Sequence, residues 1–422
     1  MMEEKSIKLN VEEVILKNGL KVLMLEEKSI PIIAFQIWYK VGSRNERPGI
    51  TGISHLFEHM MFKGSKNVGP EEHSRKINAI GGRENAFTQW DITAFYEVIP
   101  SEHLELVVYL EAERLQNLNL IPQTLTSERE VVKEERRLRT ENDPIGLAVE
   151  NLFSLSFIAH PYHWPIIGWM SDLESITIED CKEYYKTYYA PNNAVITLVG
   201  NFNKKNAISL IKKYFGKIRN EVTPTEINIS EPIQKGIRRA DISFICEAPI
   251  LLAGFKTAKA AEDENYVLEV ISSILSRGES SRIYQNLIYK KQLAAEAGGE
   301  LLKLKDYGLF YVYAFANPQA SLDEVENCLL QECEVMKNET MSPYELQKAK
   351  NQLEMNYIMQ LTSVFGKAIQ LGSSETICGT WKKILETSQK LQSVSEDDIK
   401  KVANKYFTKN NLTVIKVIPN NI

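Results

Sequence analysis

Two stretches of this sequence, SITIEDCKEYYKTYYAPNNAVITLV at residues 175–199 and SVSEDDIKKVANKYFTKNNLTVIKV at residues 393–417, align without a gap at an offset of 218 residues. In each copy a Ser or Thr precedes a helix-forming run, the run ends near an Asn pair that suits a turn, and a β-branched segment follows. Such self-similarity predicts two equivalent domains, each of which ends in a helix, a turn and a strand.

A polar connector, NEVTPTEINISEPIQKG at residues 220–236, contains two prolines and shows no helical period. We therefore predict a first domain at 1–219, a linker at 220–237 and a second, homologous domain at 238–422. Strands and helices mix without strict alternation, which predicts the α+β class, with a largely antiparallel β-sheet packed with helices in each domain. In the first domain the patterns predict strands near 11–17, 20–26, 31–41 and 91–99 and helices near 70–80, 101–118 and 122–142.

The charge balance argues against a nucleic-acid partner, because 50 Lys and Arg residues face 55 Asp and Glu residues and are spread along the chain. The amino terminus lacks a long apolar stretch, and no run of 18 apolar residues occurs anywhere, so we expect neither a leader nor a membrane span. We expect a cytoplasmic protein without membrane association, or a periplasmic one if a leader was removed. The five cysteines are scattered without a CxxC spacing and are expected to be reduced.

The stretch TGISHLFEHMMFKG at residues 51–64 contains the candidate catalytic and metal-binding residues of this domain. It holds two of the six histidines of the whole chain. His55 and His59 are four residues apart, so on a helix both can direct a ring nitrogen at one ion. Glu58 lies beside them, and the apolar residues around this trio predict a buried helix with one polar edge. A catalytic zinc site needs three protein ligands and one open position, so a third ligand is expected elsewhere.

The best source of a third ligand is TSEREVVKEERRLRTENDP at residues 126–144, which reads as a long helix. Its apolar stripe is predicted to pass through Val131, Val132 and Leu138. Glu128 and Glu135 lie on that stripe two turns apart, whereas Glu134 falls on the solvent side. Because a carboxylate on an apolar face needs a cation, Glu135 is the predicted third ligand, and Glu128 is predicted to orient a ligand imidazole.

Plainer interpretations exist for these residues. The two histidines suit hydrogen-bonded core positions, Glu135 suits a salt bridge to Arg136 or Arg139, and Glu128 suits a carboxylate in the first turn of a helix. The other histidines carry less chemistry: His73 and His103 are predicted to lie at the surface, and His160 in HPY is predicted to be structural.

At this point the residues resemble a known family. His55-x-x-Glu58-His59, followed by Glu135 76 positions after His59, resembles the M16 metallopeptidases, also called inverzincins, which include pitrilysin, insulin-degrading enzyme and the mitochondrial processing peptidase. Three further segments are similar to that family: GGRENAFTQWDITAFYEVIP at 81–100, HPYHWPIIGWMSDLESIT at 160–177 and GESSRIYQNL at 278–287. The length of the chain resembles the subunits of this family that work as pairs.

The resemblance implies a zinc endopeptidase that cleaves peptides or unfolded segments in a cleft between two domains. Glu58 would be the general base, with His55, His59 and Glu135 on Zn²⁺. Asn85 and Ala86 would belong to a sheet edge where the substrate backbone adds as a strand. The alternative is a non-catalytic scaffold subunit of a larger complex, because relatives of this fold in respiratory complexes carry no metal.

The second half is expected to repeat the fold without the chemistry. It contains no histidine after residue 238, and roughly Gln352 takes the position in the repeat that corresponds to Glu135. We therefore predict one zinc per chain. After Ser-Ser-Arg, active relatives have an arginine and a tyrosine that are thought to hold the substrate and the oxyanion; here Ile288 and Ala295 take those places. We therefore expect a heterodimer with a related M16 subunit that supplies this pair, with a homodimer as the alternative.

Overall fold

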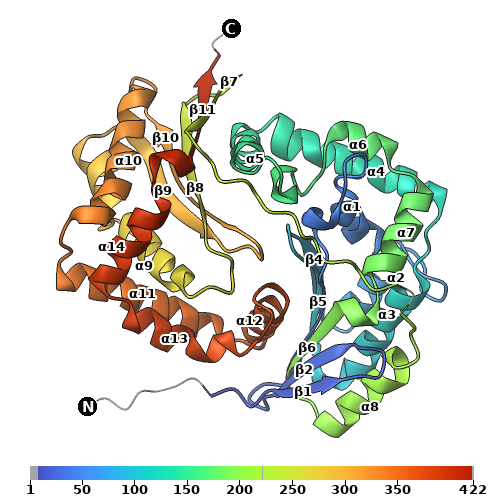
Figure 1. The fold of residues 1–422 in the computed structure, drawn as a ribbon. Helices are drawn as coiled ribbons and strands as arrows, with labels where there is room; N and C mark the ends of the chain where they lie inside the picture. The colour runs from blue at the N-terminus through green and yellow to red at the C-terminus, as the bar shows by residue number, and fades with distance from the viewer. Residues whose placement is uncertain (1–7, 221, 421–422) are drawn as a thin grey trace. The chain divides into compact units, whose positions relative to one another are not determined.

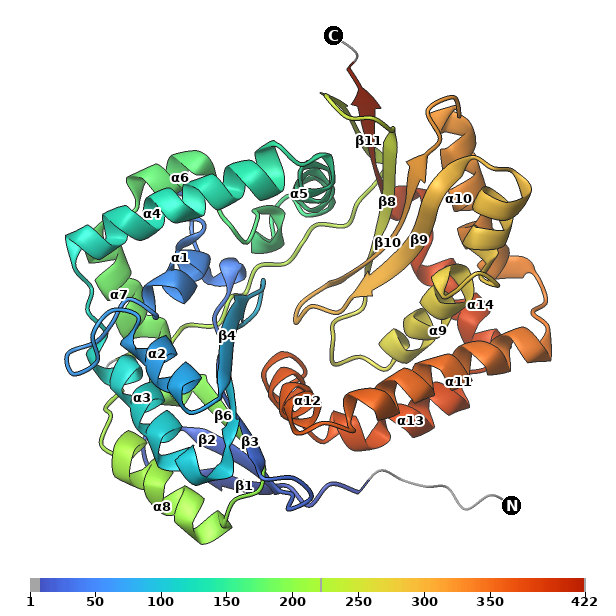
Figure 2. The same ribbon diagram turned by 180° about the vertical axis from the view of Figure 1, so that it is seen from behind.

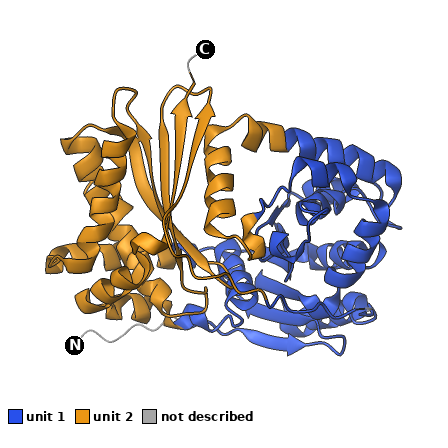
Figure 3. Ribbon diagram, turned by 45° about the horizontal axis from the view of Figure 1, so that its top comes forward, with its two compact units in different colours: residues 1–135, 164–228, 359–385 blue, residues 136–163, 229–358, 386–422 orange. Residues whose placement is uncertain are grey.

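The computed structural model describes residues 8–220 and 222–420. The chain forms two compact units, each of which has its own sheet (Figure 3). Unit 1 comprises residues 1–135, 164–228 and 359–385, and unit 2 comprises residues 136–163, 229–358 and 386–422. In the described part of the chain, no helix combines the length and the apolar character that crossing a membrane requires.

Unit 1 contains a six-stranded sheet with the order β1-β2-β6-β3-β5-β4 (Figure 1). Every neighbouring pair is antiparallel except β2 with β6, which is parallel. The strands predicted from the sequence are present, and β4 is the sheet edge that the family resemblance implied at Asn85 and Ala86. Their bounds are β1 Glu12–Ile15, β2 Lys21–Glu26, β3 Ile32–Tyr39, β4 Arg83–Thr88, β5 Thr93–Pro100 and β6 Ala194–Gly200.

Helices cover both faces of this sheet (Figure 2). On β3 the side chains alternate as a strand requires: Phe35 and Ile37 enter the main core of unit 1, whereas Trp38 faces helix α12. The helices of unit 1 are α1 Ile53–Met60, α2 Glu72–Ala79, α3 Leu104–Asn117, α4 Pro122–Arg136, α6 Met170–Ser175, α7 Ile178–Tyr188, α8 Lys204–Phe215 and α12 Val364–Ile377; Arg136, the last residue of α4, belongs to unit 2.

Unit 2 contains a five-stranded sheet with the order β7-β11-β8-β10-β9, in which only β7 and β11 are parallel. Its strands are β7 Arg238–Phe244, β8 Ile250–Thr257, β9 Ala294–Leu302, β10 Gly308–Ala316 and β11 Leu412–Pro419. Its helices, which include most of α11 and α13, are α5 Pro144–Ser156, α9 Glu264–Ser276, α10 Leu322–Asn338, α11 Pro343–Gln360, α13 Lys383–Ser393 and α14 Glu396–Tyr406.

The two sheets confirm the duplication that the sequence predicted, because β2-β6-β3-β5-β4 and β7-β11-β8-β10-β9 have the same order and the same directions. The repeated helices α7 and α14 begin with the same capping box, Thr177 with Asp180 and Ser395 with Asp398. At the helix ends, Asn193 and Asn411 each donate a side-chain hydrogen bond of 2.8 Å to the carbonyl of the preceding tyrosine, Tyr188 or Tyr406. The fold is therefore α+β with two homologous sheets.

The compact units are not continuous stretches of sequence. Helix α5, from the first half of the chain, packs on β8 and β11 in unit 2, and helix α12, from the second half, packs on β3 and β6 in unit 1. The equivalent helix of each half therefore covers the sheet that the other half provides. The predicted boundary at the linker, residues 220–237, separates the two homologous segments along the sequence and not the two compact units in space. That boundary remains a prediction.

The close packing of α12 on the unit 1 sheet depends on Gly372. A Cβ at this position would lie 2.1 Å from the Trp38 indole, which is 1% exposed and donates a 2.9 Å hydrogen bond to Gln36. Because the ring cannot move without losing this bond and its packing, we expect Gly372→Ala to lower the free energy of unfolding by about 1–3 kcal/mol. Chemical denaturation measures this, with Gly236→Ala as the matched control, since a Cβ at Gly236 meets no atom within 4 Å. Equal stability of the two variants would contradict the packing argument.

Candidate metal centre

Helix α1 carries the paired histidines and begins at a buried carboxylate. Gly52 precedes the helix in a left-handed conformation, with φ of 88°, and offers no side chain as a cap. The Glu46 carboxylate replaces that cap by accepting hydrogen bonds from the backbone N–H groups of Gly52 (2.7 Å) and Ser54 (2.8 Å). Burial raises the pKa of Glu46 to about 8, although these hydrogen bonds lower it. Glu46 was not predicted from the sequence, because a carboxylate that caps a helix from six and eight residues upstream belongs to no local motif.

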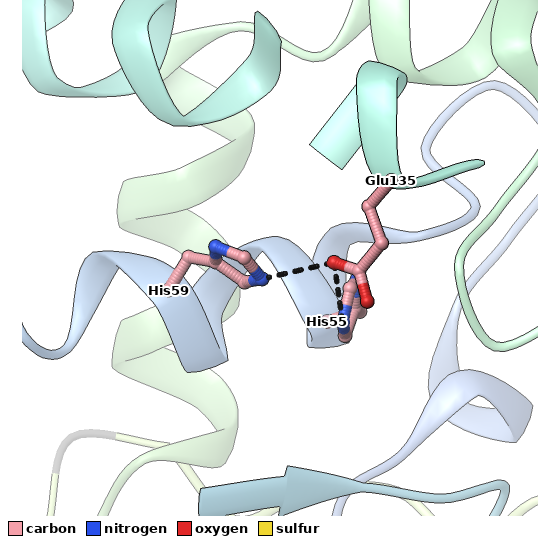
Figure 4. Close-up of side chains that lie close together, drawn as sticks. All are labelled: His55, His59 and Glu135. Atoms are coloured by element: carbon pink, nitrogen blue, oxygen red, sulfur yellow. Dashed lines mark ion pairs between the residues drawn. The ribbon is translucent and has the colours of Figure 1, made fainter. Parts of the chain in front are cut away.

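His55, His59 and Glu135 come together in unit 1, as Figure 4 shows. Oε2 of Glu135 lies 3.4 Å from Nε2 of His59 and 3.7 Å from Nε2 of His55. The three side chains are mostly buried, with exposed fractions of 13% for His55, 23% for His59 and 18% for Glu135. Two imidazoles and one carboxylate thus point at a common centre from helices α1 and α4.

This donor set fits zinc. Ligands about 2.1 Å from a tetrahedral Zn²⁺ lie about 3.4 Å from one another, which is close to the two distances to Glu135 Oε2. Two neutral imidazoles and a carboxylate also match the ligand types of catalytic zinc sites, which keep one position open. A small adjustment of the side chains would bring all three ligands into range.

Glu128 lies behind His59, on the same face of α4 as Glu135. Oε2 of Glu128 is 3.6 Å from Nδ1 of His59, so the two nitrogens of this imidazole face two different carboxylates. Glu128 is 4% exposed, and its other oxygen is 3.4 Å from the Lys63 ammonium. Since α4 begins at Pro122, Glu128 lies beyond the first turn, and the interpretation as a first-turn carboxylate is wrong. The position suits a residue that orients His59.

Glu58 lies between the two histidines in sequence and is mostly buried near Thr88 of β4. Burial raises the pKa of its carboxyl above the ordinary value; Thr88 and His59 act in the opposite direction, and the nearby Glu135 adds to the rise. A partly desolvated carboxylate next to the donor cluster is suited to accept and release a proton.

Asn85 and Ala86 lie on β4, the last strand of the unit 1 sheet. Asn85 is exposed, Ala86 is buried, and Asn85 Oδ1 accepts a 2.8 Å hydrogen bond from the Ala86 backbone. Within the described residues, β4 pairs only with β5, so its other edge presents backbone donors and acceptors. This is the kind of edge to which an extended peptide can add.

The predicted apolar stripe on α4 was wrong in part. Val132 is fully buried, but Val131 is 48% exposed and Leu138 is 62% exposed. At 100° per residue the inward face of α4 centres on Glu128, Val132 and Glu135, which leaves Val131 at its margin. Leu138 follows the end of α4 and lies in a π-helical segment, Arg137–Glu141, where the regular spacing is lost.

The prediction that His73 lies at the surface was also wrong. His73 is 5% exposed and its ring nitrogen Nε2 is 3.1 Å from the Glu97 carboxylate. The other minor histidines behave as predicted: His103 is partly exposed, and His160 is fully buried with Nε2 3.2 Å from Asp306. From the sequence alone, a polar residue on the inner face of a short helix is predicted to be exposed, because its buried partners are distant in the sequence.

Unit 2 offers no comparable group, since no cluster of three metal-ligating side chains occurs among its described residues. Gln352 lies on α11, 3.5 Å from the Ser273 hydroxyl. Ile288 packs against the core of unit 2, Ala295 is exposed on β9, and Tyr289 is 70% exposed. Neither the Ile288 nor the Ala295 side chain can donate a hydrogen bond.

Comparisons with known proteins agree along nearly the whole chain. A family model described as insulinase (peptidase family M16) matches residues 21–168, and one described as peptidase M16 inactive domain matches residues 175–353. The zinc protease PqqE of Helicobacter pylori is 32% identical over 413 residues, which cover 97% of this chain and 93% of that protein. The uncharacterized zinc protease YmxG of Bacillus subtilis is 26% identical over 392 residues, 93% of this chain and 94% of that protein.

A solved structure leads to the same family. The crystal structure of a protease from Helicobacter pylori matches with a TM-score of 0.94 and 31% identity, covering 98% of this chain and all of that one. The similarity to these proteases extends through both halves of the chain and includes the segments that carry the paired histidines and Glu135. The chain belongs to the M16, or insulinase, family of peptidases.

Proposed function

We propose that the protein is a zinc-dependent endopeptidase that cleaves peptides or unfolded segments of polypeptide. The observation that carries this proposal is the convergence of His55, His59 and Glu135, with the Glu58 carboxylate on the same helix as the two histidines. These three ligands would hold zinc, which when bound lowers the pKa of a water molecule and polarises a carbonyl group.

The chain's own residues would do the rest. The Glu58 carboxylate would accept a proton from the attacking water and donate it to the nitrogen of the leaving amine. The free edge of β4 at Asn85 and Ala86 would bind the substrate backbone as an added strand, which orients the scissile bond without selecting one side chain. Glu128 would hold the His59 ring in the orientation that presents Nε2.

The alternative function is that of a non-catalytic scaffold subunit. A scaffold has no need for a full ligand set, whereas this chain retains two histidines, the third carboxylate and the adjacent Glu58. The complete set therefore favours the peptidase.

Metal analysis tests the ligand assignment. We expect Glu135→Gln to lose one equivalent of zinc relative to the unmodified chain, because an uncharged amide is a poor zinc ligand. The matched control is Glu134→Gln, the adjacent and exposed position on the same helix, which should keep its zinc. Elemental analysis of both proteins after reconstitution gives the result. Equal zinc in the two variants would remove Glu135 from the site, and no zinc at all in the unmodified chain would favour the scaffold.

We also propose a division of labour between two related chains. This chain would carry the zinc ligands and Glu58, and an M16 subunit without the zinc motif would supply an arginine and a tyrosine to the substrate. The proposal rests on Ile288 and Ala295, which occupy the places of that pair and offer no donor. A homodimer is the alternative arrangement.

A further inference from the structure

A second group of ligand-type side chains lies buried in unit 1. His73 of α2, Glu84 of β4 and Glu97 of β5 converge, with His73 Nε2 at 3.1 Å from Glu97 Oε1 and at 3.4 Å from Glu84 Oε2. Their side chains are 6%, 10% and 1% exposed, respectively. None of the three belongs to the proposed peptidase site. The spacing of their donor atoms is similar to that around Glu135.

The two glutamates meet in an arrangement that is unfavourable without a cation or a proton. Glu84 and Glu97 are direct cross-strand partners in the β4–β5 ladder, where like charges destabilise a sheet. Glu84 Oε2, the oxygen that faces His73, is buried and has no hydrogen-bond partner among the described residues. A buried carboxylate oxygen without a partner is unfavourable, so the arrangement favours a positive ligand.

The neighbouring groups do not supply enough positive charge. Arg114 is the nearby cation: it forms two hydrogen bonds to the Glu111 carboxylate, one of 2.9 Å from Nε, and its Nη2 lies 3.6 Å from Glu97 Oε1. The His73 ring directs Nε2 at both Glu84 and Glu97, and an imidazole nitrogen can offer a lone pair to a metal ion. Glu84, Glu97 and Glu111 surround a single guanidinium, so the buried carboxyl groups outnumber the nearby cations.

We propose that His73, Glu84 and Glu97 form a second metal site, which binds a divalent first-row cation such as Zn²⁺. One imidazole nitrogen and two carboxylate oxygens are suitable ligands for such an ion, and its positive charge would offset the clustered carboxylates. The ion would join α2, β4 and β5. Glu84 faces it from the inner side of β4, whereas the next residue of that strand, Asn85, points to the opposite side. The site stabilises the edge strand, and the chain holds two metal ions where the sequence predicted one.

Counting metal ions in the full chain tests this site separately from the peptidase site. The protein is stripped with a chelator, reconstituted with Zn²⁺ and analysed by mass spectrometry. We expect two ions in the unmodified chain, one in His73→Gln, one in Glu135→Gln and none in the double variant, with circular dichroism to verify folding. A single ion in the unmodified chain that His73→Gln does not remove would overturn the proposal. The count in Glu135→Gln reports independently on the peptidase site.

A second measurement leaves the buried cluster intact. In the Glu135→Gln chain, Zn²⁺ should still raise the midpoint of thermal unfolding, because an ion that binds only the folded state stabilises it. The competing explanation is a shared proton, since burial raises the pKa of Glu111 to about 8. If a proton neutralises the cluster, zinc will leave the midpoint of Glu135→Gln unchanged, and this result too would overturn the proposal.

Discussion

Glu58→Gln is expected to keep its full complement of zinc and to lose peptidase activity by a factor on the order of 10³, within the range attributed to general acid–base catalysis. The substitution preserves the size of the side chain and removes the oxygen that accepts the proton of the attacking water. Glu58 is not one of the three clustered ligands, so metal binding and the fold should remain. Steady-state cleavage of an unstructured peptide, together with elemental analysis of the same sample, measures both quantities.

Two comparisons make the Glu58 result specific. Glu134→Gln makes the same chemical change at an exposed position near the site and should keep normal activity. Glu135→Gln should lose activity together with zinc, which distinguishes a ligand from a base. If Glu58→Gln cleaves at nearly the normal rate in the presence of any required partner, another group is the base.

The second large effect is the response to a related subunit. We expect weak cleavage by this chain alone and a rise of about 10²–10³ when an M16 chain with the arginine–tyrosine pair is added, because each preorganised donor at an oxyanion is worth about that factor. The reason lies at Ile288 and Ala295, whose side chains cannot donate a hydrogen bond. Titration of the candidate partner against a fixed amount of this chain, with peptide cleavage as the readout, gives both the size and the stoichiometry of the effect.

The matched control for this experiment is a variant of the partner. A partner in which the arginine and tyrosine are replaced by isoleucine and alanine, as in this chain, should bind equally well and should not activate. The division of labour would be refuted by full activity of the purified chain alone that no related subunit increases. Activation by the altered partner would instead mean that the partner increases peptide cleavage by some means other than its arginine and tyrosine.

Local periodicity made much of the candidate metal centre predictable. The i, i+4 spacing of His55 and His59 needs only one helix to bring both rings to one face, and the seven-residue spacing of Glu128 and Glu135 does the same on α4. That the two helices meet was expected because a carboxylate on the apolar stripe of α4 needs a cation, and the family resemblance implied the same; the structure brings Glu135 to 3.4 Å from His59. The contact between α1 and α4 depends on tertiary packing, which the periodicity of a single helix does not predict.

The duplication is readable from the amino-acid sequence, because two aligned segments with the same capping box and the same Asn turn form the same helix, turn and strand. The exchange by which α5 and α12 each cover the sheet of the other half is visible in the folded chain and in no local pattern. The same holds for the capping of α1 by Glu46 and for the pairing of Glu84 with Glu97 beside His73, both of which depend on the tertiary structure. A charged residue shows the same local pattern whether it is solvated or buried, since its environment depends on strand register and on packing between distant segments.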